Sequence, residues 1–211
     1  MTRTESKAGT PMGTGANTGQ VVTGVASCCP PVVLSLCDYT GEWPKPYEDA
    51  GYTVIRVELT EGQDVRLLRA DTLPPIHGIL AAPPCTHFSS SGACWWKGKG
   101  DGALLEGLSV VDACVRLIVA LKPMWWCLEN PVGRLIHYLG PWRMTFNPCD
   151  YGDPYTKRTC LWGDFNTELP ENPVAPEAKS RIHHMSPGPD RGRLRSVTPP
   201  GFARAFFEVN P

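Results

Sequence analysis

The stretch VVLSLCDYTGEWPKPYEDAGYTVIRVEL, residues 32–59, decides the fold class. Residues 32–37 are a short, largely apolar run that begins with two β-branched valines, typical of a central parallel strand buried on both faces. Residues 45–52 then predict a short helix ended by Gly51, and residues 52–59 a second strand that finishes on Glu58. This order of strand, helix and strand indicates a crossover unit of a parallel sheet.

The same alternation continues along the chain. Further strands are predicted at 76–83, 124–130, 143–147 and 158–163, and helices at 103–123, 132–139 and 201–209. We therefore expect an α/β fold with a mainly parallel sheet flanked by helices. The glycine-rich segment 86–102 has the composition of a mobile lid.

Composition and length set the domain organisation. Residues 1–30 lack periodicity and predict a disordered tail, which leaves residues 31–211 as a single domain. No apolar run approaches membrane-spanning length, so we expect a cytoplasmic protein without membrane contact. The nine cysteines fit reduced thiols, and a zinc site is not predicted from the irregularly spaced Cys149, Cys160, His183 and His184.

Polar residues gather where the predicted strands end. Asp38–Trp43 follows the first strand, and Glu58, Cys85 and Glu129 follow three others. In open parallel sheets, ligands bind at this carboxyl edge. Taken alone, Cys85 reads equally well as a nucleophile or as a packed thiol. Glu129 alone reads better as a carboxylate paired with a basic residue such as Arg134 than as a partly desolvated acid.

Several motifs in order resemble the DNA (cytosine-5) methyltransferase family: PPCTHFS at 83–89, ENP at 129–131, YGDPYTKRT at 151–159 and RSVTPPGFAR at 195–204. The resemblance covers most of residues 33–204. It implies a Rossmann-like methyltransferase fold, S-adenosylmethionine as cofactor and DNA containing cytosine as substrate. A compact member of the kind that phages and prophages carry, in a bacterial host, fits the short chain, and we expect a monomer.

The resemblance also assigns roles to particular residues. It implies that Cys85 adds to carbon 6 of cytosine while Glu129 donates a hydrogen bond to nitrogen 3. Lys157 or Arg158 would hold the flipped nucleotide, and Ser89, Lys97, Lys99 and Arg195 would lie near phosphates. The residues expected at the cofactor are Tyr39, Thr40, Gly41, Trp43, Glu58, Asp64, Val65 and Pro84.

The chain departs from the family pattern at several places. Tyr39 and Glu42 replace two motif glycines, and Lys157 stands where the family has an arginine. Trp43 stands where an aromatic ring commonly stacks on the adenine, with core packing as the alternative. The region 164–195, where the family carries target recognition, is a short Pro-rich loop with a basic end, which suits phosphate contact or a solvated surface equally well.

Two further interpretations stay open. The short recognition region favours carbon-5 chemistry on another cytosine substrate, such as RNA or a nucleotide, or a separate specificity partner. The altered glycine turn favours a degenerate, non-catalytic DNA-binding relative. Against the latter, a binding module has no need for both Cys85 and Glu129.

Overall fold

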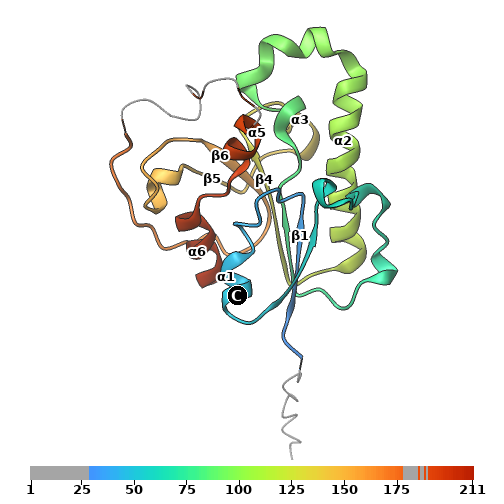
Figure 1. Cartoon of the computed structure of the whole chain (residues 1–211), viewed down its shortest axis with the longest axis vertical. Coiled ribbons are helices and arrows are strands. Elements are labelled where there is room, and N and C mark those ends of the chain that lie inside the picture. The colour runs from blue at the N-terminus through green and yellow to red at the C-terminus, as the bar shows by residue number, and fades with distance from the viewer. Residues whose placement is uncertain (1–28, 178–184, 186–187, 189) are drawn as a thin grey trace, which may run out of the picture.

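The computed structural model describes residues 29–177, 185, 188 and 190–211, and shows a mixed sheet covered by helices on both faces (Figure 1). The strands are β1 (Val32–Leu36), β2 (Thr53–Val57), β3 (Gly78–Ala81), β4 (Trp125–Pro131), β5 (Met144–Phe146) and β6 (Thr159–Asp164). Their order is β2-β1-β3-β4-β6-β5. The first four strands pair in parallel, and β6 and β5 continue the sheet antiparallel. The prediction of a mainly parallel α/β sheet is confirmed.

The helices are α1 (Lys45–Asp49), α2 (Trp96–Leu121), α3 (Ile136–Leu139), α5 (Arg191–Ser196) and α6 (Pro200–Val209). Short 3-10 turns occupy Leu59–Glu61 (η1), Val65–Leu67 (η2), Ala70–Thr72 (η3), Cys85–His87 (η4), Ser90–Trp95 (η5) and Pro148–Tyr151 (η6). Among the described residues, no helix is both long and apolar enough to cross a bilayer.

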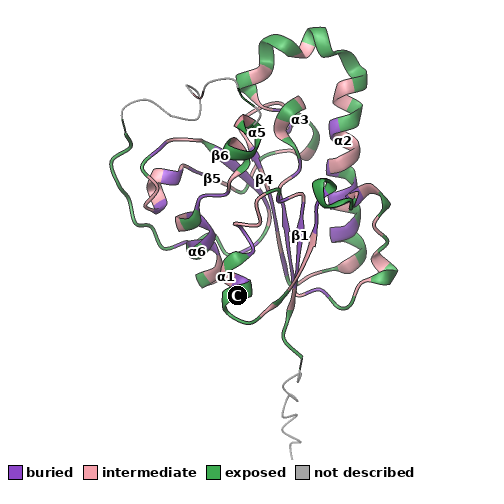
Figure 2. Cartoon of the chain, viewed as in Figure 1, coloured by how far each residue is buried: buried purple, intermediate pink, exposed green. Residues whose placement is uncertain are grey.

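Alternation along the strands builds two cores, one on each face of the sheet (Figure 2). Leu34 and Leu36 of β1 face α2, where they join Val111, Cys114 and Leu117. The intervening strand positions supply the opposite core, which includes Val33, Leu80, Cys127 and Leu161 and packs on α1 and α6 through Trp43, Tyr47, Phe202 and Phe206. Burial on both faces explains why the strands read as continuous apolar runs.

Segment 86–102 differs from the predicted loop. Apart from Phe88 and Ser89, it consists of η4, η5 and the first turns of α2, so this helix begins at Trp96 and not near residue 103. Gly100, at φ 68° and ψ −177°, interrupts the helical backbone. The glycines that predicted a loop thus act at one position as a kink, because glycine adopts positive φ at little cost.

The region 164–195 is only partly a surface loop. Phe165 and Leu169 are buried in the core that faces α6, so its first residues belong to the domain. Two of its basic residues, Lys179 and Arg181, lie outside the described residues, as do residues 1–28 and the pair His183 and His184. In the part that is described, no three His, Cys, Asp or Glu side chains form a group able to hold a metal ion.

Candidate active site

The carboxyl ends of β1, β3 and β4 bring the predicted catalytic residues to one edge of the sheet. Cys85 is the first residue of η4, four residues after β3 ends at Ala81. Glu129 lies inside β4, the strand that pairs with β3. Parallel pairing of β3 with β4 places the two segments side by side. The expected convergence of Cys85 and Glu129 therefore follows from strand register.

Cys85 is half-buried at the start of its turn. The backbone N–H groups of Phe88 and Ser89 both donate to its carbonyl oxygen at 2.9 Å, which fixes the turn that presents the thiol. Burial raises the pKa of the Cys85 thiol, and the carboxylate of Glu129 raises it further. The charges of Lys157 and Arg195 act in the opposite direction and lower this pKa. The thiolate form thus depends on two nearby cations.

Glu129 and Lys157 form a pair within the same edge. The Lys157 Nζ lies 3.7 Å from Glu129 Oε1, and each side chain is 15% exposed. Desolvation raises the pKa of Glu129 above its ordinary value, against the lowering effect of Lys157, and Asp38 raises it further. A carboxyl group of this kind keeps its proton to higher pH than a solvated one.

Lys157 and Arg158 are not equivalent in position. Lys157 reaches the Glu129 carboxylate, whereas the Arg158 side chain is exposed. The backbone of Arg158 accepts a hydrogen bond from the Val132 N–H at 3.4 Å, next to the ENP segment. Of the two cations predicted at the site, Lys157 is the one that the structure pairs with the acid.

Asn130 joins the two segments that carry Cys85 and Glu129. Its side chain is fully buried, and its Nδ2 donates to the Pro83 carbonyl oxygen at 2.8 Å. This bond joins β4, which carries Glu129, to the Pro-Pro segment before Cys85. Asn130 sets the spacing of the thiol and the acid, a role that the ENP motif alone does not reveal.

We expect Asn130→Ala to lower the free energy of unfolding by about 1–3 kcal/mol, because the Pro83 carbonyl would stay buried without its donor. Urea denaturation monitored by circular dichroism measures this difference. Replacing the exposed Asn172 with alanine is the matched control and should change stability little. An Asn130→Ala protein as stable as the wild type would contradict the role of this bond.

Gly133 fixes the loop after Cys85 from the other side. Residues Ser89 and Gly133 form an antiparallel bridge, and the Arg134 N–H donates to the Phe88 carbonyl at 2.9 Å. A Cβ atom at Gly133 would lie 1.9 Å from the Phe88 carbonyl oxygen. The close approach of these two backbones therefore requires glycine.

Gly133→Ala should destabilise the protein by about 1–3 kcal/mol, since the two backbones would have to separate. The thermal midpoint, measured by calorimetry, reports the loss. Gly92→Ala provides a control on the same loop, because a Cβ there would meet nothing within 4 Å. Equal midpoints for the two variants would show that the contact tolerates a methyl group.

The turn after β1 is organised by Asp38, which sequence reasoning did not single out. This side chain is 5% exposed, and its Oδ1 accepts from the Gly41 N–H at 3.1 Å and the Thr40 N–H at 3.2 Å. Its Oδ2 accepts from the Trp43 N–H at 3.1 Å. An aspartate two residues after a strand and two residues before Thr-Gly is a turn-forming pattern that indicates this role.

Within that turn, the aromatic residues divide between core and surface. Trp43 has no exposed surface and packs against Phe202 and Phe206 at ring-centroid distances of 6.0 and 5.8 Å. The structure thus shows the core-packing alternative for Trp43. Tyr39 is 40% exposed at the same turn, so it is the aromatic ring accessible to a ligand.

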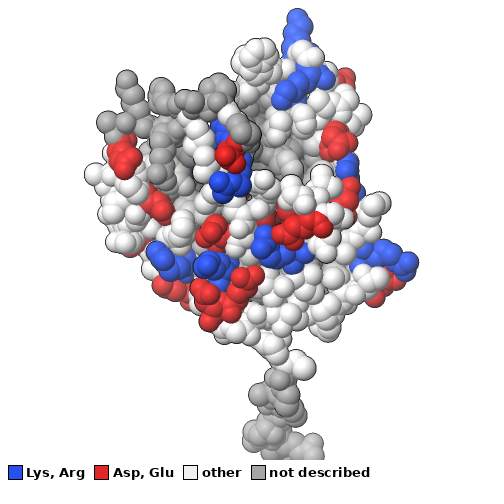
Figure 3. All heavy atoms as spheres, in the orientation of Figure 1, with Lys and Arg blue, Asp and Glu red and all other residues white. Residues whose placement is uncertain are grey.

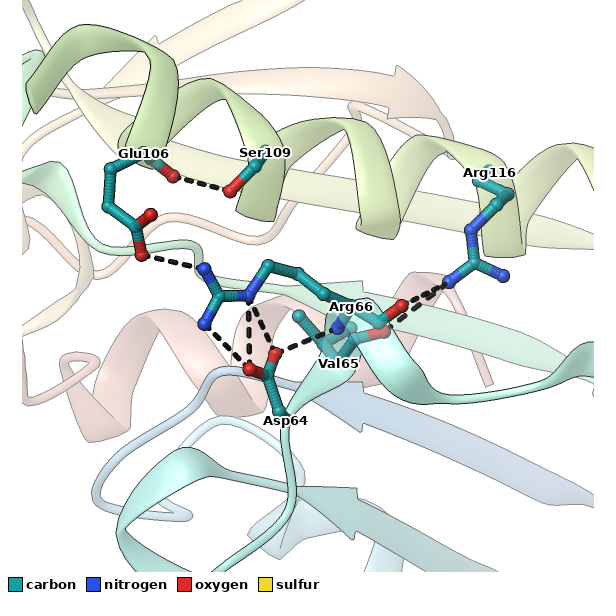
Figure 4. A network of polar contacts seen from close by, with 6 residues as sticks. All are labelled: Asp64, Val65, Arg66, Glu106, Ser109 and Arg116. Atoms are coloured by element: carbon teal, nitrogen blue, oxygen red, sulfur yellow. Dashed lines mark hydrogen bonds and ion pairs between the residues drawn. The ribbon is translucent and has the colours of Figure 1, made fainter. Parts of the chain in front are cut away.

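The acidic residues beyond β2 are engaged in local contacts. Glu58 is 8% exposed and accepts from the Thr60 N–H at 3.2 Å. Asp64 accepts from the backbone and guanidinium of Arg66, whose other arm reaches Glu106 at 2.6 Å (Figure 4). The hydrogen bonds from Arg66 lower the pKa of Asp64.

Arg116 of α2 fixes the backbone that follows Asp64. Its Nη2 donates to the carbonyl oxygens of Val65, Arg66 and Leu68 at 3.4, 3.3 and 3.1 Å. The Val65 side chain is buried beneath this loop. Figure 4 shows Arg116 and Glu106 reaching the loop from one helix, which holds it against the sheet.

Three of the residues predicted near phosphates, Ser89, Lys97 and Lys99, lie along the segment after Cys85, and Arg195 lies on α5. The Lys99 Nζ donates to the Thr86 carbonyl oxygen at 3.0 Å, and Lys97 is exposed. The Ser89 and Ser91 hydroxyls lie 2.9 Å apart, and Arg195 Nη2 donates to Ser91 Oγ at 3.4 Å. Lys99 and Arg195, distant in sequence, thus flank the Cys85 loop.

The fold is an α/β fold whose candidate site lies at the carboxyl edge of the parallel strands in a mixed six-stranded sheet. Residues 52–142 match the family model of the C-5 cytosine-specific DNA methylases, which is under half of the 211-residue chain. Over these residues the chain is similar to that family. The matched range contains Cys85 and Glu129 and ends before Lys157.

A solved structure from E. coli, described as a DNA modification methyltransferase encoded within a prophage, is similar to this chain at 19% sequence identity. The similarity covers 76% of this chain and 56% of that one, at a TM-score of 0.48. The chain thus spans little more than half the length of that protein. No curated protein matches the sequence.

Proposed function

We propose that this chain transfers a methyl group to carbon 5 of cytosine in DNA. The observation that carries the proposal is the charge-coupled group of Cys85, Glu129 and Lys157 at one edge of the sheet. Carbon 5 of cytosine is a weak nucleophile. A thiol above the ring and a proton donor at its edge are the pair that activates it.

The chemistry starts with the thiolate of Cys85, which adds to carbon 6. The electron pair displaced from the ring double bond is stabilised when the Glu129 carboxylic acid donates its proton toward nitrogen 3. Carbon 5 then becomes nucleophilic and takes the methyl group. Loss of the carbon 5 proton to a base re-forms the double bond and expels Cys85 as a thiolate.

Lys157 has two effects on these reaction steps. Its charge favours the Cys85 thiolate. Its Nζ also lies 3.7 Å from Oε1 of Glu129, the acid that donates its proton toward nitrogen 3 of the cytosine. Arg195 assists the thiolate in the same direction. A cytosine inside a duplex cannot reach these groups, so the target base must leave the stack.

S-adenosylmethionine, when bound, supplies an electrophilic methyl group. The residues that follow β1 and β2 would hold this cofactor: Gly41 adopts φ +69°, Tyr39 is accessible and Glu58 directly follows β2. The Arg56 guanidinium lies against Gly41, 2.6 Å from where a Cβ would stand. Because that contact is made by the end of a partly exposed side chain, Arg56 is able to move aside.

Methylation of host DNA tests the proposal. We would express the chain and Cys85→Ser in a bacterial strain without cytosine methylation, and map 5-methylcytosine by bisulfite sequencing. The wild-type culture should contain the mark and the Cys85→Ser culture should lack it. Unmodified DNA from cells that contain soluble, folded wild-type protein would overturn DNA as the substrate, and a mark in RNA would redirect the proposal there.

A further inference from the structure

An exposed helical arm follows the catalytic turn. It comprises residues 90–102, which form η5 and the first turns of α2, and Figure 1 shows it arching above the carboxyl edge of the sheet. Within this arm only Gly92 and Trp96 are not exposed (Figure 2). The arm therefore presents its side chains to solvent beside the candidate active site.

The base of the arm is fixed to the Cys85 loop. The Arg134 guanidinium stacks over the Trp96 ring at 4.6 Å from its centroid, while its Nε donates to the His87 carbonyl at 2.7 Å. Lys99 returns to the Thr86 carbonyl at 3.0 Å. These contacts, next to Cys85 in sequence, set where the arm stands.

Trp95, the neighbour of the stacked Trp96, is used differently. Its side chain is 69% exposed, and it contacts no other aromatic ring or guanidinium among the described residues. Other described tryptophans, among them Trp43, Trp125 and Trp162, are largely buried. An indole ring left in water is unfavourable, so its exposure on a fixed arm indicates a binding role.

Basic residues lie on the same arm and at its base, and Asp101 is the one acidic residue of the arm. Lys97 and Lys99 follow Trp95 on the arm, and Arg195 approaches from α5 through its bond to Ser91. The upper end of Figure 3 shows lysine and arginine atoms gathered at one tip of the molecule. An exposed aromatic ring among cations matches a base flanked by phosphates.

We propose that Trp95 stacks on a nucleobase of the DNA next to the position that the target cytosine vacates. This inference rests on the proposed function. A base that leaves the duplex exposes the faces of its neighbours, and an aromatic side chain recovers the lost stacking. Stacking tolerates any base, since every base has a flat π face, which suits a chain with little room for base readout.

The test measures affinity by fluorescence anisotropy for a labelled duplex that carries a C·A mismatch. Trp95→Ala should weaken binding about 5- to 150-fold, which corresponds to ~1–3 kcal/mol for one stacked base. Trp95→Phe should recover most of the affinity. Leu105→Ala, which removes an exposed apolar side chain farther along α2, should bind as the wild type does.

Salt dependence separates stacking from charge. Trp95→Ala should leave the slope of log affinity against log salt unchanged, whereas Lys97→Ala should reduce it by about one. Wild-type affinity in Trp95→Ala, or equal losses in Trp95→Ala and Leu105→Ala, would overturn the stacking role. Circular dichroism confirms that each variant is folded.

Covalent trapping on 5-fluorocytosine DNA distinguishes this inference from the proposed function. Wild-type trapping together with unimpaired binding by Trp95→Ala would overturn only the role of Trp95. Absent trapping together with weakened binding by Trp95→Ala would overturn only cytosine chemistry and support the stacking role. If the wild-type protein bound no DNA, both would be overturned.

Discussion

Cys85→Ser is expected to abolish covalent trapping on DNA that contains 5-fluorocytosine. Fluorine at carbon 5 cannot leave as a proton does, so an active wild-type protein stops with its sulfur bonded to carbon 6. A serine hydroxyl at neutral pH supplies almost no alkoxide, and the neighbouring cations Lys157 and Arg195 cannot compensate for its much higher pKa. The rate of adduct formation should fall by about 10⁴-fold or more.

Denaturing electrophoresis followed by mass spectrometry of the adduct measures this result. Cys94→Ser is the matched control, because Cys94 is an exposed thiol on the arm nine positions away in sequence. It should form the adduct as the wild type does. An adduct that persists in Cys85→Ser, or disappears in Cys94→Ser, would assign the nucleophile to another residue.

Glu129→Gln is expected to lower the methylation rate by about 10²- to 10⁴-fold, because an amide cannot transfer a proton to the ring nitrogen. Its side chain keeps nearly the same size and still fits beside Lys157, so the protein should stay folded and bind DNA. Single-turnover assays with tritiated methyl donor measure the rate. Glu48→Gln, at an exposed carboxylate on α1, is the control and should remain active.

The pH profile gives this prediction a second, sharper readout. The proposed reaction requires a protonated Glu129 and an ionised Cys85, and the pKa values of both groups are raised. As pH rises above the pKa of Glu129, the fraction of Cys85 thiolate grows tenfold per pH unit while the fraction of protonated Glu129 falls tenfold. The two changes cancel, so the rate becomes constant. Above the pKa of Cys85 the thiolate is complete, and the rate falls with the remaining acid.

Glu129→Gln should remove both the plateau and the alkaline fall of the pH profile. With a permanently neutral side chain at this position, the rate should follow the Cys85 thiolate alone. It should rise tenfold per pH unit until the pKa of Cys85 and then stay constant. An alkaline fall that survives in Glu129→Gln would show that another group carries the proton.

Much of the site was predictable because its chemistry depends on residue type and order along the chain. Cys85 after a buried strand and Glu129 within another had to meet at one edge once the strands paired in parallel. The segment Asp38–Trp43 is placed correctly from sequence, but the role of Asp38 is not, because this side chain accepts from backbone groups of its own turn. The ENP motif does not reveal the bond that Asn130 makes, because its partner, Pro83, lies 47 residues away.

The sequence by itself determined the α/β architecture, the pairing of a thiol with an acid, and the resemblance to cytosine-5 methyltransferases. These follow from local apolar periodicity and from residue identity, which need no tertiary contact. Only the tertiary structure decided that Lys157 and not Arg158 faces the acid, that Trp43 is buried while Trp95 is exposed, and that segment 86–102 is helical. The reason is that side-chain direction and burial depend on segments distant in sequence, such as Arg134 and α6, whose approach no local pattern encodes.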